Sequence, residues 1–161
     1  IQYKTNYKCL MPTNTFGPND NYNALNSHFL PALIKKVNDL KLNNKKELML
    51  WGNGLAKREV IYVDDLADAC IYFMKKSFSG TILNIGTGKD FSITQYAKII
   101  LNKIIPNNKI KIKYDLSKPN GTPRKVLDIK LANKYGWKPK TKLDEAIIKT
   151  YKKFLKNIKI G

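Results

Sequence analysis

The feature that most constrains the fold is an alternation of short apolar runs, each ended by glycine, proline or a polar residue, with longer amphipathic segments. The apolar runs have the length of strands and the longer segments have the spacing and caps of helices. We expect strands at 7–11, 47–51, 59–63, 81–85 and 110–114, the first of them buried, and helices at 27–42, 64–76, 93–104, 128–136 and 142–157. The caps expected for the last four helices are Asp64 or Asp65, Ser92 in a capping box with Gln95, Asp128 and Thr141. This order of elements predicts an α/β fold.

Charge alone would suggest a nucleic-acid partner, since the formal net charge is +18. The chain contains 28 lysines and only two arginines, and the lysines are spread along its whole length. Proteins that read bases cluster their cations and favour arginine, so we expect no nucleic-acid partner. No apolar run reaches the length of a membrane span, which predicts a cytoplasmic protein without a membrane partner. Two cysteines form no disulfide framework and are expected to be small buried residues.

Because lysine fills nearly every basic position, the arginines Arg58 and Arg124 indicate sites that need a planar, bidentate cation. Arg58 follows Trp51 and a Gly-Asn-Gly turn. An aromatic ring at a strand end beside an arginine suits a nucleotide, with Trp51 on a ring or ribose and Arg58 on a diphosphate. The alternative is a β-hairpin with a core tryptophan and an arginine paired with Asp64 or Asp65.

Three further motifs could contribute to a site. A loop from Pro12 to Pro18 follows the first predicted strand, and ligands in α/β folds lie at strand ends. The only histidine, His28, stands at a helix start and could transfer protons. A basic loop at 118–125 could close over phosphates. Each has a plainer alternative: a polar loop, a surface histidine, or a solvated basic loop. Gly86-Thr87-Gly88 lacks the remaining features of a dinucleotide fingerprint.

The order of these motifs resembles the C-terminal half of the GDP-L-fucose synthases, which are extended short-chain dehydrogenases. The resemblance rests on Pro-Thr-Asn-x-x-Gly-Pro, Asn-Ser-His, Trp-Gly-x-Gly with arginine, Val-Asp-Asp, Asn-x-Gly-x-Gly and Lys-Pro-x-Gly-Thr-Pro-Arg-Lys, in that order. It implies that residues 1–161 form a single substrate-binding domain. The last strand or strands of a cofactor-binding Rossmann half are included, and the rest of that half lies outside the chain.

The family converts GDP-4-keto-6-deoxy-mannose to GDP-L-fucose by epimerisation at C3 and C5 and reduction at C4 with NADPH. The resemblance implies that His28 is the catalytic acid of the epimerisation. It implies no metal, a homodimeric whole protein, and a chain inactive without the glycine-rich loop and Tyr-x-x-x-Lys pair expected upstream. The implied contacts to the nicotinamide end of NADP are Pro12, Thr13, Asn14 and Thr15, and those to the GDP-sugar are Lys36, Trp51, Arg58, Asn120 and Lys125.

Asn120 departs from the family pattern, because aspartate is expected there. Lys36 stands where either an arginine or a lysine contacts the nucleotide. These positions leave the sugar open, and related enzymes act on GDP-colitose precursors or GDP-heptoses. Two alternatives remain for the whole chain: the substrate domain of a dTDP- or UDP-sugar 4,6-dehydratase or 4-epimerase, and, more distantly, a basic nucleic-acid-binding domain.

Overall fold

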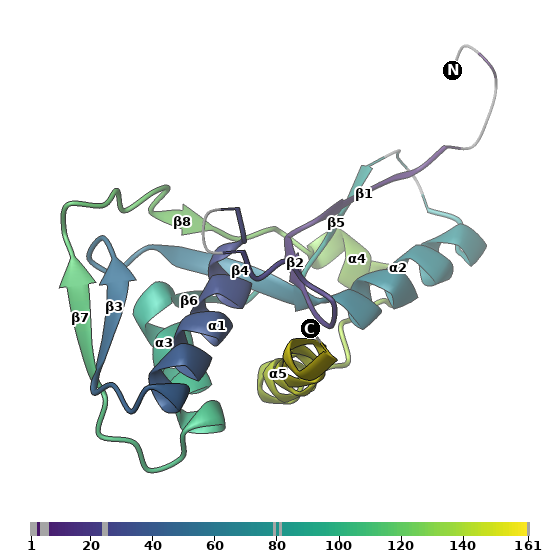
Figure 1. The fold of residues 1–161 in the computed structure, drawn as a ribbon. Helices are drawn as coiled ribbons and strands as arrows, with labels where there is room; N and C mark the ends of the chain where they lie inside the picture. Colours follow the sequence, from purple (N-terminus) through teal and green to yellow (C-terminus); the bar gives the residue numbers. More distant parts are fainter. Residues whose placement is uncertain (1–2, 4–6, 24–25, 79, 81, 161) are drawn as a thin grey trace.

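The computed structural model describes residues 3, 7–23, 26–78, 80 and 82–160. Strands and helices alternate along the chain, which confirms the α/β class (Figure 1). The strands are β1 (Cys9–Pro12), β2 (Asn14–Phe16), β3 (Glu47–Trp51), β4 (Lys57–Tyr62), β5 (Ile82–Ile85), β6 (Asp90–Ser92), β7 (Lys111–Asp115) and β8 (Arg124–Lys125). The helices are α1 (Phe29–Leu42), α2 (Val63–Lys75), α3 (Ile93–Ile104), α4 (Lys130–Lys134) and α5 (Leu143–Ile160).

Strand β4 crosses the middle of the molecule and organises the sheets (Figure 1). It pairs in parallel with β2 and β8 and antiparallel with β6. Two further parallel pairs flank it, β3 with β7 and β1 with β5. β4 ends at Tyr62 and α2 begins at the next residue, so the chain passes from strand to helix without a loop.

Apolar side chains form two clusters. The larger one joins α1, α3 and α5 to β3 and β4, with Ile34, Val37 and Ile100 fully buried. The smaller one packs α2 and α4 on β5 around Phe73 and Trp137. Burial of the apolar surface of these two clusters supplies most of the favourable free energy of folding.

Three short strands, β2, β6 and β8, were not predicted from the sequence. Two of them, β2 and β8, lie in segments that were predicted as loops. Two or three residues carry no readable periodicity, and each of these strands exists because β4 offers it a partner. The first predicted strand is present as β1, but the prediction that it is buried was wrong. Cys9 and Met11 are exposed, and so is Cys70, which contradicts the expectation of buried cysteines. Residues 24, 25 and 81, within a predicted loop and strand, lie outside the described part.

Helix starts were predicted with mixed success. The capping box of Ser92 and Gln95 is confirmed on α3. Asp64 and Asp65 do not cap α2 but lie in its first turn. Asp65 instead accepts hydrogen bonds from the backbone N–H groups of Lys140 and Thr141. Thr141 donates its hydroxyl to Asp65 and caps no helix. The predicted cap of α4, Asp128, precedes the actual N-cap residue by one position.

Candidate functional site

A cleft of about 290 Å³ brings together four of the five residues predicted to bind substrate: Lys36, Trp51, Arg58 and Asn120. They come from α1, the end of β3, the start of β4 and the loop before β8. Aliphatic and aromatic side chains form its floor, among them Phe29, Leu33, Leu50 and Ile93. Separate elements far apart in sequence thus converge on a small apolar hollow rimmed by cations and amides, as ligand sites do.

Trp51 is a surface residue, because 58 % of it is exposed at the end of β3. The ammonium of Lys36 lies 5.4 Å from the centre of its ring, and that of Lys118 lies 5.7 Å away. β3 pairs with β7 and not with β4, so the hairpin alternative with a core tryptophan is wrong. An exposed indole flanked by cations offers a stacking face for a base and charge for a phosphate.

Lys36 points from α1 toward the same ring and donates to the Met49 carbonyl at 3.3 Å. Burial lowers the pKa of this ammonium, and the nearby carboxylate of Asp115 opposes the shift. A partly desolvated cation gains more from an anionic ligand than a fully hydrated one does. Lys36 is therefore suited to a phosphate oxygen in the cleft.

Arg58 is held by backbone carbonyls rather than by a carboxylate. Its Nη1 donates to the carbonyls of Lys57, at 2.8 Å, and Thr122, at 2.5 Å. Among the described residues it forms no ion pair, so the expected pairing with Asp64 or Asp65 is also wrong. The guanidinium is positioned by the loop before β8 while its remaining N–H groups stay available to an anion.

Asn120 joins that loop to the turn after β3. Its Oδ1 accepts a hydrogen bond from the backbone N–H of Asn53 at 2.7 Å. Gly52 has a positive φ of 66°, and a Cβ there would lie 2.5 Å from the same oxygen. The amide nitrogen of Asn120 has no partner among the described residues and can donate to a ligand. Asparagine thus keeps the acceptor that an aspartate would supply and adds donors to the cleft.

A buried carboxylate that the sequence analysis did not single out fixes β4 beside Arg58. Glu59 is completely buried and accepts N–H groups from Thr87 at 2.5 Å, Gly88 at 2.7 Å and Leu127 at 2.7 Å. A Cβ on Gly86 would collide with Glu59 Oε1, so glycine is needed at that turn. The available signal was a lone acidic residue inside an apolar strand, which in a folded protein must be hydrogen-bonded.

The remaining predicted residues lie outside the cleft lining. His28 is the exposed N-cap residue of α1, and its side chain makes no capping bond. It stands between Ser27 and Phe29, which both line the cleft. Lys125 is exposed on β8, where it pairs in register with Arg58. His28 and Lys125 are thus neighbours of residues that line the cleft, but neither lines it.

The segment predicted to touch the cofactor is tied to the carbonyl of Glu59. Thr13 Oγ1 and Asn14 Nδ2 donate to it at 3.2 and 2.9 Å. Thr15 Oγ1 donates to the carbonyl of Thr13, and Pro12 ends β1 opposite Ile85. Pro12 and Thr13 lie at the carboxyl ends of the parallel strands β1 and β5, Asn14 and Thr15 begin β2, and none of the four lines the cleft.

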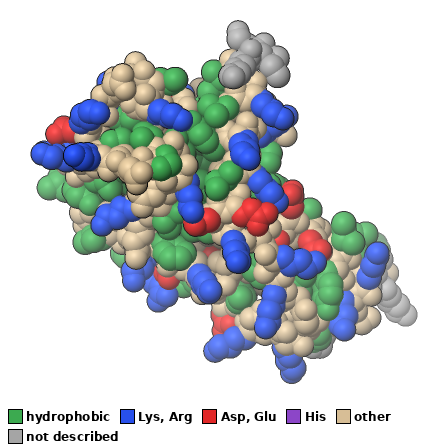
Figure 2. Space-filling view, turned by 90° about the horizontal axis from the view of Figure 1, so that it is seen from below, with side chains coloured by type: hydrophobic (Ala, Val, Ile, Leu, Met, Phe, Trp, Pro, Cys, Tyr) green, Lys and Arg blue, Asp and Glu red, His purple; other side chains and the backbone are tan. Residues whose placement is uncertain are grey.

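Charge is dispersed on the face seen in Figure 2. Lysines surround that face, and acidic side chains lie between them near its centre. Within the described part of the chain no three His, Cys, Asp or Glu side chains could together hold a metal ion. Over the same residues no helix has the length and apolar character needed to cross a membrane.

Comparisons with known proteins agree on one family. The model of the NAD dependent epimerase/dehydratase family matches residues 1–86. A probable GDP-L-fucose synthase 1 of Oryza sativa subsp. japonica is 40% identical over 158 residues, covering 98% of this chain and 48% of that protein. A GDP-L-colitose synthase of Yersinia pseudotuberculosis is 39% identical over 150 residues, covering 92% of this chain and 48% of that protein.

The fold comparison gives the same picture. The crystal structure of a GDP-L-fucose synthetase from Naegleria fowleri bound to NADP superposes with a TM-score of 0.82. It is 26% identical and covers 94% of this chain and 47% of that one. The chain therefore spans about half the length of the relatives that it matches.

Proposed function

The chain belongs to the NAD dependent epimerase/dehydratase family, and from this premise we propose that it forms the GDP-sugar-binding part of an NADPH-dependent 3,5-epimerase and 4-reductase. The product would be GDP-L-fucose or a related GDP-deoxysugar or GDP-heptose. The observation that carries the proposal is the cleft in which Trp51, Arg58 and Lys36 converge. The similarity of the chain to GDP-L-fucose and GDP-L-colitose synthases supports GDP as the nucleotide.

Each cleft residue has a distinct role in this proposal. The exposed ring of Trp51 packs against the base or ribose, where stacking is worth about 1–3 kcal/mol per base. Arg58 donates two N–H groups to the diphosphate, and Lys36 adds a partly desolvated charge. Asn120 donates its free amide to the same ligand. The cleft is at the small end of the usual range of about 300–1,000 Å³, so the sugar extends beyond it.

His28 acts in this proposal as the acid of epimerisation. Its imidazole is exposed and uncommitted beside the cleft, so it is free to deliver a proton to a carbanion of the bound sugar. Replacing His28 by alanine in the whole protein should slow epimerisation more than ketone reduction. Product analysis by NMR in deuterated water separates the two steps, and an equal loss of both would contradict this role.

NADPH would supply the hydride for reduction at C4. Among the residues that face it in the proposal, Pro12 and Thr13 lie at the carboxyl ends of β1 and β5, where ligands bind in open α/β sheets, and Asn14 and Thr15 begin β2. The side chains of Thr13 and Asn14 are anchored to the Glu59 carbonyl and that of Thr15 to the Thr13 carbonyl, which leaves them a packing role at the nicotinamide end. The NADP-bound structure of the Naegleria fowleri enzyme supports this choice of cofactor.

The same proposal assigns β1 and β5 to the cofactor-binding half and the rest of the chain to the substrate-binding domain. In support, β5 packs in the smaller apolar cluster with α2, whereas the cleft is built on the larger one. The homodimeric state and the cytoplasmic location of the whole protein stay predictions, as does the inactivity of the chain alone.

Calorimetric titration of the chain with GDP, UDP, dTDP and duplex DNA at two salt concentrations tests the proposal. We expect GDP to bind most tightly and binding to weaken in Arg58→Lys. Equal affinity for UDP or dTDP would favour the dehydratase or 4-epimerase alternative. DNA binding that falls steeply with salt and shows no nucleotide selectivity would favour the basic-domain alternative.

A further inference from the structure

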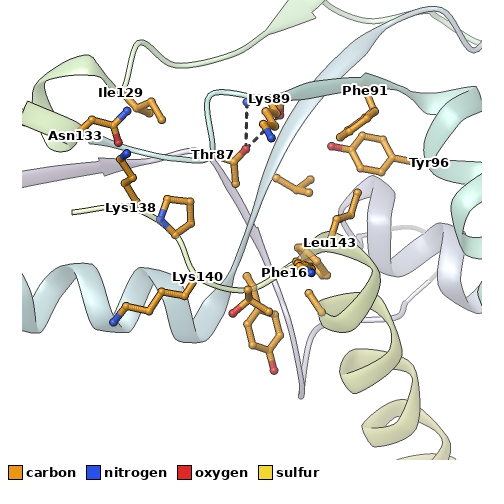
Figure 3. Close-up of a pocket in the computed structure, with 16 residues that line it drawn as sticks. Phe16, Thr87, Lys89, Phe91, Tyr96, Ile129, Asn133, Lys138, Lys140 and Leu143 are labelled. Atoms are coloured by element: carbon orange, nitrogen blue, oxygen red, sulfur yellow. Dashed lines mark hydrogen bonds between the residues drawn. The ribbon is translucent and has the colours of Figure 1, made fainter. Parts of the chain in front are cut away.

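A second cavity, of about 640 Å³, lies further along β4 and shares no lining residue with the cleft. Figure 3 shows Ile129, Asn133 and Lys138 on one side of it and Phe91, Tyr96 and Leu143 on the other. The ring of Tyr96 packs 5.3 Å from that of Phe29, so an aromatic wall separates this cavity from the cleft. We propose that the cavity is a second ligand site, for an organic anion with a flat apolar body.

The interior of the cavity is apolar. Phe16, Val60 and Phe91 come from three neighbouring strands, whereas Ile129 precedes α4 and Leu143 begins α5. Figure 3 shows the labelled side chains of Phe16, Phe91, Ile129 and Leu143 around a common space. The rings of Phe91 and Tyr96 meet edge to face at 5.6 Å, which presents a ring surface to a flat ligand.

The rim of the cavity is cationic and contains no acidic residue. Lys89, Lys138, Lys140 and Lys142 all line it. Lys140 pairs with Asp68 at 3.0 Å, whereas the other three form no ion pair within the described part of the chain. Ammonium groups around an apolar space whose lining contains no carboxylate create a positive potential that favours an anionic group at the mouth.

The start of α5 contributes to the wall of the cavity. Leu143 and Ala146, in the first turns of the helix, line the cavity. The acidic residues of the first turn, Asp144 and Glu145, pair with Lys103 at 2.6 Å and Lys149 at 2.8 Å, and neither lines the cavity.

Both parts of the ligand are required by these observations. An inorganic anion would leave the apolar interior in contact with water, and a neutral aromatic would leave the lysines without a partner. The volume falls within the usual range for small-molecule sites, about 300–1,000 Å³. The ligand class is thus an aromatic phosphate, sulfonate or carboxylate, independent of the GDP-sugar proposed for the cleft.

The probe for this site is 1-naphthyl phosphate, compared with 1-naphthalenemethanol and with inorganic phosphate by calorimetry and by NMR of the ¹⁵N-labelled chain. We expect only the naphthyl phosphate to bind, with amide shifts at Thr87, Lys138 and Leu143. Saturating GDP should leave its affinity unchanged. Lys138→Gln and Lys142→Gln should each weaken it about three- to ten-fold, as expected for a partly exposed charge contact.

Matched controls make the result decisive. Lys152→Gln removes an exposed lysine of α5 outside the cavity and should leave binding unchanged. Leu143→Trp fills the space and should abolish binding, with an unchanged melting temperature reporting an intact fold. Equal binding of the neutral alcohol or of inorganic phosphate would overturn the proposal. Displacement by GDP, or shifts centred on Trp51, would place the probe in the cleft and overturn it as well.

Discussion

Arg58 and Glu59 are neighbours in sequence and face opposite sides of β4, and their charges are used in opposite ways. Glu59 is completely buried, and its carboxylate is saturated by N–H groups from the turn after β5 and the segment after β8. Arg58 is held by two carbonyls, and no carboxylate of the described residues neutralises it. One charge holds the fold together and the other is left available for a ligand.

The second arginine extends this contrast. Arg124 pairs with Asp90 through Nε at 2.5 Å and Nη2 at 3.2 Å, a bidentate contact inside the protein. That contact lowers the pKa of the Asp90 carboxyl. Both arginines thus occupy positions where a planar donor is useful, but among the described residues only Arg124 has a carboxylate partner. Whether a charge serves folding or binding is decided by what surrounds it, and separate measurements of stability and affinity distinguish the two.

The largest expected effect is that of Glu59→Ala. It leaves the partly buried N–H groups of Thr87, Gly88 and Leu127 without this partner, and each unsatisfied buried group costs about 1–3 kcal/mol. We expect the free energy of unfolding to fall by about 3–5 kcal/mol, measured by urea denaturation. Glu47→Ala is the control, because Glu47 is exposed and its ion pair with Lys113 spans 3.8 Å. Similar losses in both variants would contradict a structural role for Glu59.

Arg58→Lys should reduce GDP affinity about ten-fold, because lysine keeps the charge but loses the planar pair of donors. The melting temperature should stay within about 2 °C, since the residue is not part of the apolar core. Calorimetry and thermal unfolding of one preparation measure both quantities. In Arg124→Lys, a matched change at an internally paired arginine, we expect the reverse: unchanged affinity and a slightly lower melting temperature. Loss of stability without loss of GDP affinity in Arg58→Lys would show that Arg58 serves folding rather than binding.

Trp51→Ala should weaken GDP binding about five-fold, as loss of one stacked base on an exposed ring implies. Stability should be nearly unchanged, because more than half of the side chain is exposed. Leu55→Ala removes another exposed apolar side chain near the turn after β3 and is the control. Quenching of tryptophan fluorescence by GDP in the unaltered chain, lost in Trp51→Ala, locates the contact. Persistence of the full quench would place the base near Trp137 instead.

The smallest effect concerns pH. Burial lowers the pKa of Lys36, so this ammonium loses its proton at a lower pH than an ordinary lysine. The protonated form attracts the diphosphate, and GDP affinity should therefore decline as the pH rises from about 7 toward 10. Lys36→Arg stays protonated over that range and should remove most of the decline. A decline of equal size in Lys36→Arg would assign the titration to another group.

Much of this protein could be predicted from its sequence, because its long elements carry periodicity and punctuation. The helix with a capping box at Ser92 and the strand from Glu47 to Trp51 were both predicted correctly. Arg58 was singled out as well, since an arginine in a lysine-rich chain signals a need for its planar geometry; it lines the cleft, and its role in binding stays a prediction. These are local signals, and they do not depend on where the rest of the chain lies.

Long-range pairing decided the rest. Strands of two or three residues, such as β8, exist only because β4 offers them hydrogen bonds. The burial of Glu59 also depends on tertiary structure. Its carboxylate accepts hydrogen bonds from the N–H groups of Thr87 and Leu127, which lie 28 and 68 positions away along the chain. The second cavity joins strand residues to the start of α5 and has no sequence motif. Composition and spacing predicted the α/β class and singled out Trp51 and Arg58, whereas only tertiary contacts determined which charges are neutralised and which remain open to a ligand.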